Sequence, residues 1–254
     1  MIIPEVKFKL ANIDFEVCNL YYFSFFCGDW NKFVFKRHPK LKEHLKLAKS
    51  ENERKLAIRN YVKKFWKENN HKLMNQRKKF QEEWDKINDK YMTILSDVLE
   101  TEWQNEKKNI TALISINPIC PRILKTWTFS IFGLEKNIKK VYKTIAHEVL
   151  HFLYFKKWKE VFPKSKESSF ESPHVEWYLS EILAPVILNN LKIQKIIKIK
   201  ASGYEEFRRI KIGQRNLIDH FTILYKEHLK KKESFSEFLK IAYKEIEKYR
   251  KLIR

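Results

Sequence analysis

The residues best suited to chemistry in this chain stand close together in IAHEVLHFLYF, residues 145–155. His147, Glu148 and His151 have the spacing H-E-x-x-H. On a helix, a separation of four residues is about one turn, so both imidazoles project from one face and can bind one ion. Neutral imidazole nitrogens are good zinc ligands, and Glu148 beside the first histidine is placed to act as general base toward a water. The spacing therefore predicts a hydrolytic zinc centre with Glu148 as its catalytic residue.

A catalytic zinc ion normally has three protein ligands, and three downstream acids are candidates for the third. Glu171 lies in a polar loop. Glu176 stands near the start of a predicted helix, where a carboxylate complements the helix dipole. Glu181 is the one charged residue between Trp177 and Leu188, and a carboxylate on so apolar a helix needs a strong partner. We expect Glu181 to be the third ligand, with Glu176 as the alternative.

Hydrophobic periodicity predicts the elements that carry these residues. TWTFSIFG, residues 126–133, alternates with a period of two and predicts a half-buried strand, and TALISINPICPR before it predicts a shorter one. Helical signals run from about residue 137 to 159. They begin again at Ser172-Pro173, which has the pattern of an N-cap followed by proline. The HEVLH stretch is therefore expected on a helix that follows two strands and precedes the helix of Glu181.

Most of the remaining chain has helical patterns. Residues 5–15 alternate loosely and indicate a strand, and the aromatic stretch 17–28 indicates either a buried strand or a docking segment. Residues 39–103 indicate helix, with Ser50 as an N-cap and one apolar stripe along the second half. Residues 191–203 are ambiguous between helix and strand, and two helices are expected after them. The stripe consists of Phe80, Trp84, Ile87, Tyr91, Ile94, Val98 and Trp103. The inner face of the last helix consists of Phe238, Ala242, Ile246, Tyr249 and Ile253.

These patterns predict an α+β fold that is mainly helical. We expect an N-terminal helical region over residues 1–110, a catalytic core with a small sheet over 111–190, and a C-terminal helical region over 191–254. With 254 residues and 44% hydrophobic content, the three regions are expected to form one compact unit.

Charge and cysteine content narrow the class of protein. The net charge of +21 attracts nucleic acid, anionic lipid or acidic proteins. The lysines are spread over nearly every segment, so charge alone does not establish a nucleic-acid partner. Three cysteines without a CxxC pair argue against a disulfide framework. The N-terminus lacks the apolar run of a signal peptide, and the most apolar early stretch is too short to span a bilayer. We expect a soluble cytoplasmic protein.

Residues 112–190, with HEVLH at their centre, resemble the zincin metallopeptidases. The resemblance implies that His147 and His151 bind Zn²⁺ and that Glu148 acts as base and then acid in hydrolysis of peptide or protein substrates. The metzincin extension is absent, because Tyr154 and Lys157 stand where its glycine and third histidine would be. The resemblance is therefore to the gluzincins, in which a downstream glutamate is the third ligand.

The resemblance has further consequences. The gap from His151 to Glu181 is longer than in thermolysin-like enzymes, and Pro185 stands where an aspartate would orient a ligating histidine. The family also implies that an edge strand beside the active-site helix pairs with extended substrate, a part that either predicted strand could play. Four residues are candidates for stabilising the transition state: Tyr178, Tyr204, His220 and Arg122.

Two other classes of protein remain open at this point. A basic nucleic-acid-associated protein with a zinc site would show a clustered positive face with interleaved exposed aromatic side chains. A helical interaction protein with a degenerate centre would be expected to have lost one of the three motif residues. All three are intact.

Overall fold

The structure is a computed structural model of the chain, and it describes residues 2–104 and 108–253. It is mostly helical with a small sheet, which confirms the predicted mainly helical α+β class. Packing divides it into two units, here called the sheet unit (Glu5–Lys86 and Asn109–Thr144) and the site unit (Met1–Pro4, Ile87–Lys108 and Ile145–Arg254). Both units combine stretches that are distant in sequence. The division into three regions stays a prediction.

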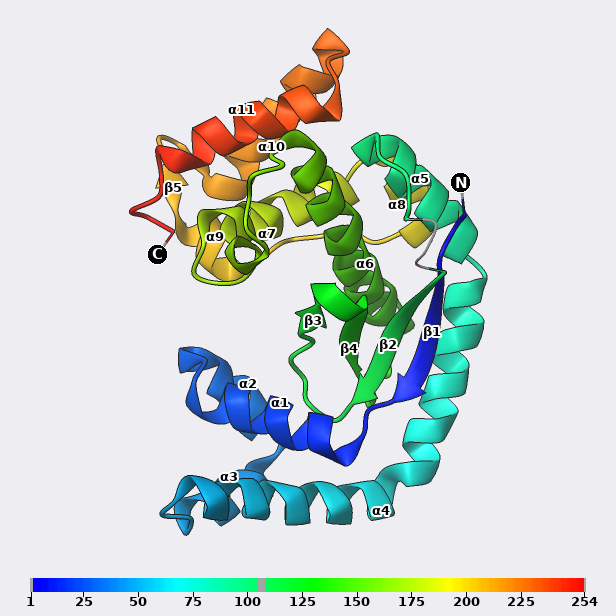
Figure 1. Cartoon of the computed structure of the whole chain (residues 1–254), viewed down its shortest axis with the longest axis vertical. Coiled ribbons are helices and arrows are strands. Elements are labelled where there is room, and N and C mark those ends of the chain that lie inside the picture. The colour runs from blue at the N-terminus through cyan, green and yellow to red at the C-terminus, as the bar shows by residue number, and fades with distance from the viewer. Residues whose placement is uncertain (1, 105–107, 254) are drawn as a thin grey trace. The chain divides into compact units, whose positions relative to one another are not determined.

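The sheet unit contains a four-stranded sheet in the order β1-β2-β4-β3 (Figure 1). Strands β1, β2 and β4 run parallel, and the short β3 is antiparallel to β4. The strands are β1 (Glu5–Leu10), β2 (Asn109–Ser115), β3 (Arg122–Ile123) and β4 (Thr128–Phe132). The helices and 3₁₀ turns are α1 (Ile13–Phe25), η1 (Gly28–Trp30), α2 (Asn31–Arg37), α3 (Pro39–Lys46), α4 (Glu51–Asp85) and η2 (Leu124–Thr126).

Strand β1 lies at one edge of the sheet, and α4 covers its open backbone. The Gln81 side chain accepts a hydrogen bond from Phe8 N at 3.0 Å and donates one to Val6 O at 2.9 Å. A side-chain amide thereby takes the place of a neighbouring strand. Such pairing blocks the addition of a further strand at this edge.

Two strand predictions were wrong in detail. Strand β4 was expected to be half-buried, yet Ser130 is buried along with Phe129 and Ile131, because an inner strand of a parallel sheet is covered on both faces. Neither β2 nor β4 is an edge strand, since β2 lies between β1 and β4, and β4 lies between β2 and β3. Neither β2 nor β4 can therefore be the edge strand that, by the resemblance, would pair with an extended substrate.

The N-terminal segment differs from the expected strand. Strand β1 ends at Leu10, and α1 begins at Ile13 because the Asn12 side chain accepts a hydrogen bond from Phe15 N at 2.8 Å and caps the helix. The aromatic stretch is therefore helical where a buried strand was one expectation. Its residues Tyr22 and Phe26 are exposed.

Helix α4 begins as predicted, with Ser50 and Glu53 forming a capping box. The predicted apolar stripe, however, does not continue through residue 103. Helix α4 ends at Asp85, and α5 (Asn88–Leu99) is a separate helix with its own phase. Ile94 and Val98 are only partly buried as a result, and the apolar side chains that α5 buries are Tyr91, Met92, Leu95 and Leu99.

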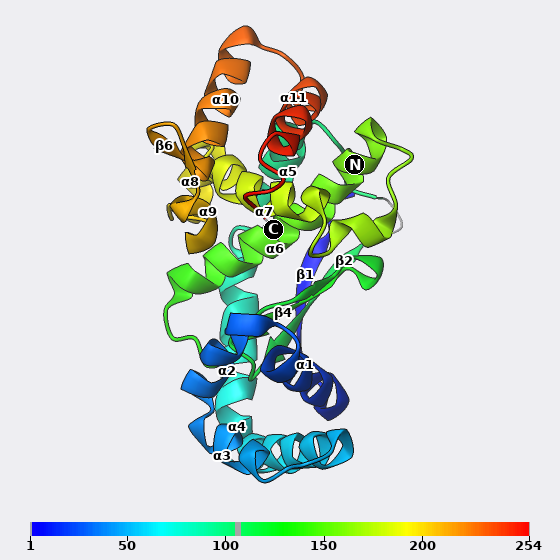
Figure 2. The ribbon, with the colours of Figure 1, turned by 90° about the vertical axis from the view of Figure 1, so that its left-hand side faces the viewer.

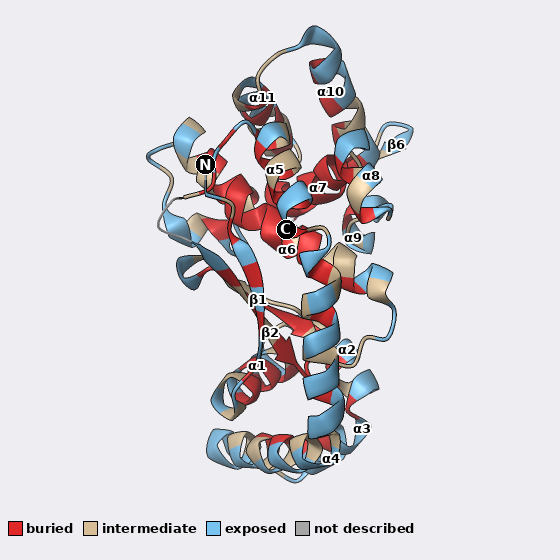
Figure 3. Cartoon of the chain, turned by 90° about the vertical axis from the view of Figure 1, so that its right-hand side faces the viewer, coloured by how far each residue is buried: buried red, intermediate tan, exposed pale blue. Residues whose placement is uncertain are grey.

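The site unit is built around α7, which is buried along almost its whole length (Figure 3). Helices α10 and α11 pack against it (Figure 2). Besides α5, the elements are α6 (Ile138–Val161, whose first residues belong to the sheet unit), η3 (Glu167–Phe170), α7 (Val175–Leu188), α8 (Leu191–Ile197), α9 (Glu205–Arg209), β5 (Lys211–Ile212), β6 (Arg215–Asn216), α10 (Leu217–Lys231) and α11 (Phe235–Glu247).

Several boundaries in this unit differ from the sequence prediction. The N-cap of α7 is His174 and not Ser172, so the helix starts later than expected. The ambiguous segment forms α8, and a left-handed Lys198 ends it. A short helix and a two-stranded hairpin precede the two predicted C-terminal helices. In the last of these Phe238, Ala242 and Ile246 are buried as expected. Across the described residues, every helix is too short or too polar to cross a bilayer.

A buried carboxyl group holds the chain after β2 in place. Glu16 of α1 accepts hydrogen bonds from Ile116 N and from Ser115 Oγ, both at 2.8 Å. The Ile116 carbonyl accepts from Nε2 of His38 at 2.8 Å, and Nδ1 of that ring accepts from the Tyr61 hydroxyl. Burial raises the pKa of Glu16 from 4.5 to about 7 despite the two hydrogen bonds, and burial lowers the pKa of His38.

The raised pKa makes the stability of the sheet unit depend on pH. The folded chain binds the Glu16 proton more tightly than the unfolded chain does. This stabilisation is therefore full below about pH 4.5 and is lost as the pH rises through about 7. We expect the free energy of unfolding of the native chain to fall by about 3 kcal/mol relative to Glu16→Gln over this range. Urea unfolding followed by circular dichroism at several pH values would measure this difference. A difference in free energy between the two proteins that is the same at every pH would contradict this prediction. The pH dependence that His38 contributes cancels in the comparison, because both proteins contain His38.

Candidate metal centre

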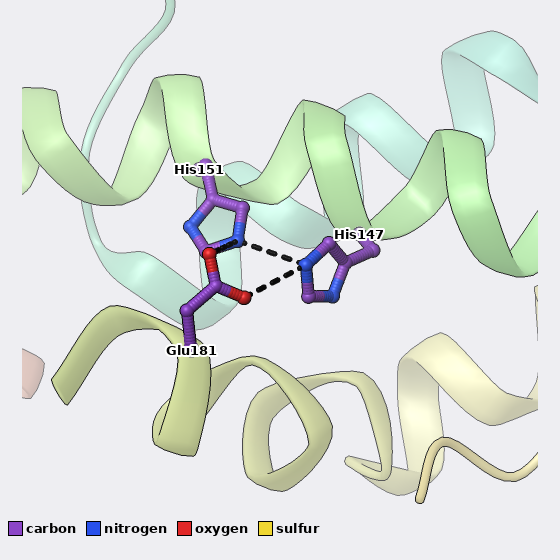
Figure 4. Close-up of side chains that lie close together, drawn as sticks. All are labelled: His147, His151 and Glu181. Atoms are coloured by element: carbon purple, nitrogen blue, oxygen red, sulfur yellow. Dashed lines mark hydrogen bonds and ion pairs between the residues drawn. The ribbon is translucent and has the colours of Figure 1, made fainter. Parts of the chain in front are cut away.

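Two neighbouring helices bring three potential metal ligands together. His147 and His151 lie one turn apart on α6, and Glu181 projects toward both imidazoles from α7 (Figure 4). Nε2 of His147 lies 3.1 Å from Glu181 Oε2, and Nε2 of His151 lies 3.4 Å from Glu181 Oε1. The two Nε2 atoms are 3.1 Å apart. All three side chains therefore direct their ligand atoms at one point.

The separations of these atoms fit a small tetrahedral metal ion. Two ligand atoms on a zinc ion at about 2.0–2.1 Å lie about 3.3–3.4 Å apart, close to the 3.1 to 3.4 Å observed. Both imidazoles must then carry their proton on Nδ1, so that Nε2 is free to bind. Two nitrogens and one carboxylate oxygen are a ligand set that zinc accepts. The group formed by His147, His151 and Glu181 could therefore hold a metal ion.

Burial is uneven around the three side chains. His151 and Glu181 expose 0% and 1% of their side chains, whereas His147 exposes 19%. The group is therefore closed on the His151 side and reachable from solvent beside His147. Three protein ligands with one accessible side are typical of catalytic zinc sites, whereas structural zinc sites are closed.

Contacts within the site unit hold α6 in position. The Tyr91 hydroxyl of α5 donates to the carbonyl of Ala146, next to His147, at 2.6 Å. Lys157 is buried and donates to the carbonyl of Glu100 at 2.8 Å, at the C-terminal end of α5, where a cation is favoured. The residue at the metzincin third-histidine position thus has a structural role. The Phe155 ring stacks on the His151 ring, with their centroids 6.1 Å apart.

A close approach of the chain to α7 positions an aromatic side chain beside the site. Gly203 has a φ of +65°, and a Cβ there would lie 2.5 Å from Ile218 and 3.0 Å from Pro185. The segment can pass so close because residue 203 has no side chain. The next residue, Tyr204, places its ring centroid 6.4 Å from that of His147. Pro185 thus contributes to packing beside the site and lacks the N–H that would bond the Glu181 carbonyl.

A further acid near the site was not found by sequence reasoning. Burial and the negative charge of Glu181 raise the pKa of Glu206, in the first turn of α9. The electrostatic influence of Glu181 indicates that the two carboxylates lie near each other, which a bound cation would favour. In the sequence Glu206 looks like an ordinary acidic residue at a helix start. Phe155 could have been found, because it lies four residues after His151 on the same helical face.

The structure also places the other sequence candidates. Glu171 is exposed. Burial raises the pKa of Tyr154 and of Tyr243, and the charge of Glu176 raises both further. The group of potential metal ligands contains neither Glu171 nor Glu176. Glu148 is buried on α6. Glu181 is the acid that lies with the two histidines, and the choice of third ligand and the role of Glu148 stay predictions.

Of the candidates for transition-state stabilisation, Tyr204 is the one whose ring lies against a histidine of the motif. Tyr178 packs against Trp177 and Phe207. Nε2 of His220 lies within hydrogen-bonding distance of Glu245 Oε1, at 3.0 Å, which indicates a structural role. Arg122 lies on β3 of the sheet unit.

Comparison with known proteins gives no match for this chain among protein-family models, curated proteins or solved structures. The site must therefore be interpreted from its own geometry.

Proposed function

We propose that this protein is a zinc-dependent peptidase, with His147, His151 and Glu181 as the metal ligands. The proposal rests on the spacing of their ligand atoms, 3.1 to 3.4 Å, together with the exposed side at His147. Zinc, when bound, supplies a Lewis acid that polarises a carbonyl and lowers the pKa of a water. The H-E-x-x-H spacing supports a hydrolytic role more than a structural one.

Each residue of the site would then have a separate role. The neutral imidazoles and the Glu181 carboxylate hold the cation, and the carboxylate balances part of its charge. The Glu148 carboxylate accepts a proton from the attacking water and returns it to the leaving amine nitrogen. His147, on the exposed side, lies where the substrate enters. Phe155, packed against His151, keeps water from the closed side.

The test is the dependence of hydrolysis on metal. The purified native chain is expected to contain close to one zinc per chain by elemental analysis and to cleave unfolded casein. Treatment with a chelator should remove both the metal and the activity, and added Zn²⁺ but not Mg²⁺ should restore them, because two imidazoles disfavour Mg²⁺. His151→Ala is the matched variant and should neither hold the metal nor cleave. Cleavage that survives complete removal of zinc would overturn the proposal.

Tyr204→Phe tests the aromatic neighbour of His147. A phenol close to the site can donate a hydrogen bond to the oxyanion that develops during amide hydrolysis, and removing one such donor costs about 10²-fold or more in turnover when it is well aligned. We expect zinc content to stay at the native level and kcat to fall by at least about tenfold. Tyr178→Phe, whose ring contacts Phe207, is the control and should keep native kcat. Equal turnover of both variants would exclude Tyr204 from the chemistry.

A further inference from the structure

The last turn of α1, η1 and α2 expose a group of aromatic side chains in the sheet unit. We call Tyr22, Phe25, Phe26, Trp30 and Phe33 the aromatic patch. Tyr22, Phe26 and Phe33 expose 54%, 63% and 58% of their surface. Leaving so much hydrocarbon in water is unfavourable, and exposed apolar groups of this kind mark interaction surfaces.

Positive charge accompanies the patch. Residues 31–49, which include α2 and α3, contain seven lysine and arginine residues but only one acid, Glu43. Lys32 pairs with Asp29 of η1 at 2.6 Å. All seven basic side chains are exposed: Lys32, Lys36, Arg37, Lys40, Lys42, Lys46 and Lys49. This local excess is part of the net charge of +21 of the whole chain. The partner of the patch should therefore be anionic and should also accept apolar side chains.

The packing of the rings favours a lipid surface over a nucleic acid. Bases stack on open ring faces. Here the Arg54 guanidinium lies over Phe25 at 4.8 Å, and Tyr22 and Phe26 are stacked on each other with centroids 6.3 Å apart. One face of each of these three rings is therefore occupied, which leaves less ring surface on which bases could stack. Phenylalanine also brings no hydrogen-bond donor to read a base, whereas it readily enters the headgroup boundary of a bilayer.

We propose that the aromatic patch and the basic side chains of residues 31–49 form a docking surface for an anionic phospholipid bilayer. The aromatic side chains enter the interface of one leaflet, and the lysines contact the headgroup phosphates. Apolar insertion and electrostatic attraction contribute together, which is the combination that stable peripheral binding requires. The protein would associate with the surface without crossing the bilayer.

Vesicle sedimentation with the full chain tests this proposal. The native protein should bind phosphatidylcholine vesicles that contain about one third phosphatidylserine at least about tenfold more tightly than pure phosphatidylcholine vesicles. Phe26→Ser with Phe33→Ser should weaken this binding by about tenfold or more. Lys36→Glu with Lys40→Glu should weaken it by a similar factor, since each basic residue near the surface contributes roughly fivefold.

Matched controls come from exposed residues of the site unit. Leu191→Ser with Leu229→Ser removes two apolar side chains that are 79% and 49% exposed. Lys226→Glu with Lys230→Glu changes the net charge by the same amount as the lysine pair on α2 and α3. Both control proteins should bind anionic vesicles within about threefold of the native level, because their changes lie outside the proposed surface. Thermal unfolding would verify that each variant folds. If the variant with both phenylalanines replaced does not fold, the variant with both lysines replaced still tests the proposal.

Several outcomes would overturn the proposal. One is that the native chain fails to bind anionic vesicles. Another is that the control pairs lose as much binding as the patch variants. Binding of a single-stranded oligonucleotide that Phe26→Ser with Phe33→Ser abolishes would make nucleic acid the occupant. Self-association that the same pair abolishes in analytical ultracentrifugation would make a second copy the occupant. Hydrolysis is not measured in these experiments, so their result is independent of the proposed peptidase activity.

Discussion

Glu181→Ala is expected to leave the purified protein with less than about a tenth of the native zinc and with no measurable hydrolysis. Loss of even an outer partner of a metal ligand lowers affinity by about 10- to 100-fold, and loss of a ligand should cost at least as much. The remaining His147 and His151 would be two ligands where a catalytic zinc needs three. Zinc content by elemental analysis after gel filtration, and zinc affinity by competition with a chromophoric chelator, measure the effect.

Glu176→Ala is the matched control for this prediction. It removes the same side chain from the same helix, at a position whose charge influences Tyr154 and Tyr243 and lies outside the histidine group. It should retain native zinc and activity. The ligand assignment would be refuted if Glu176→Ala lost the metal while Glu181→Ala kept it. Thermal unfolding with and without chelator gives a second readout, since an ion that binds only the folded chain stabilises it.

Glu148→Gln is expected to separate metal binding from chemistry. The substitution keeps the size of the side chain but removes its ability to accept a proton, and general-base catalysis contributes about 10²- to 10⁴-fold. Zinc content should therefore remain native while kcat for unfolded casein falls by at least about 10²-fold. Such a split between metal and turnover is not produced by a general loss of folding.

Glu160→Gln provides the control for that substitution. Glu160 lies on α6 as well, but its carboxylate accepts hydrogen bonds from Thr101 and Lys156, away from the motif. Native turnover of this variant would show that a glutamine on α6 is tolerated in itself. An active Glu148→Gln protein would exclude Glu148 as the base and would leave the metal group without its proposed chemistry.

Local patterns predicted those parts of the fold that local physics decides. Ser50 caps α4 because its hydroxyl and the Glu53 carboxylate satisfy free N–H groups within one turn. The aromatic stretch was less predictable. A run of apolar residues suits a buried strand or a helix equally well, and the Asn12 cap together with packing against α4 selects the helix. The break between α4 and α5 was missed because the apolar spacing continues across it.

The pair of histidines in the candidate site is a property of the sequence itself. Their separation of four residues on a helix places both imidazoles on one face whatever surrounds them, because the helical repeat is local. Glu181 could be favoured from the sequence because a lone carboxylate in an apolar helix needs a partner.

What only the tertiary structure decided is which acid meets the histidines. That depends on how α7 is rotated and shifted against α6, and a one-residue change in phase turns a side chain by about 100°. Helix α7 packs against α10 and α11, and in this packing Glu181 faces the imidazoles while Glu176 lies outside the group that they form. The sequence alone placed the two histidines on one helical face, and long-range packing brought the Glu181 carboxylate to them.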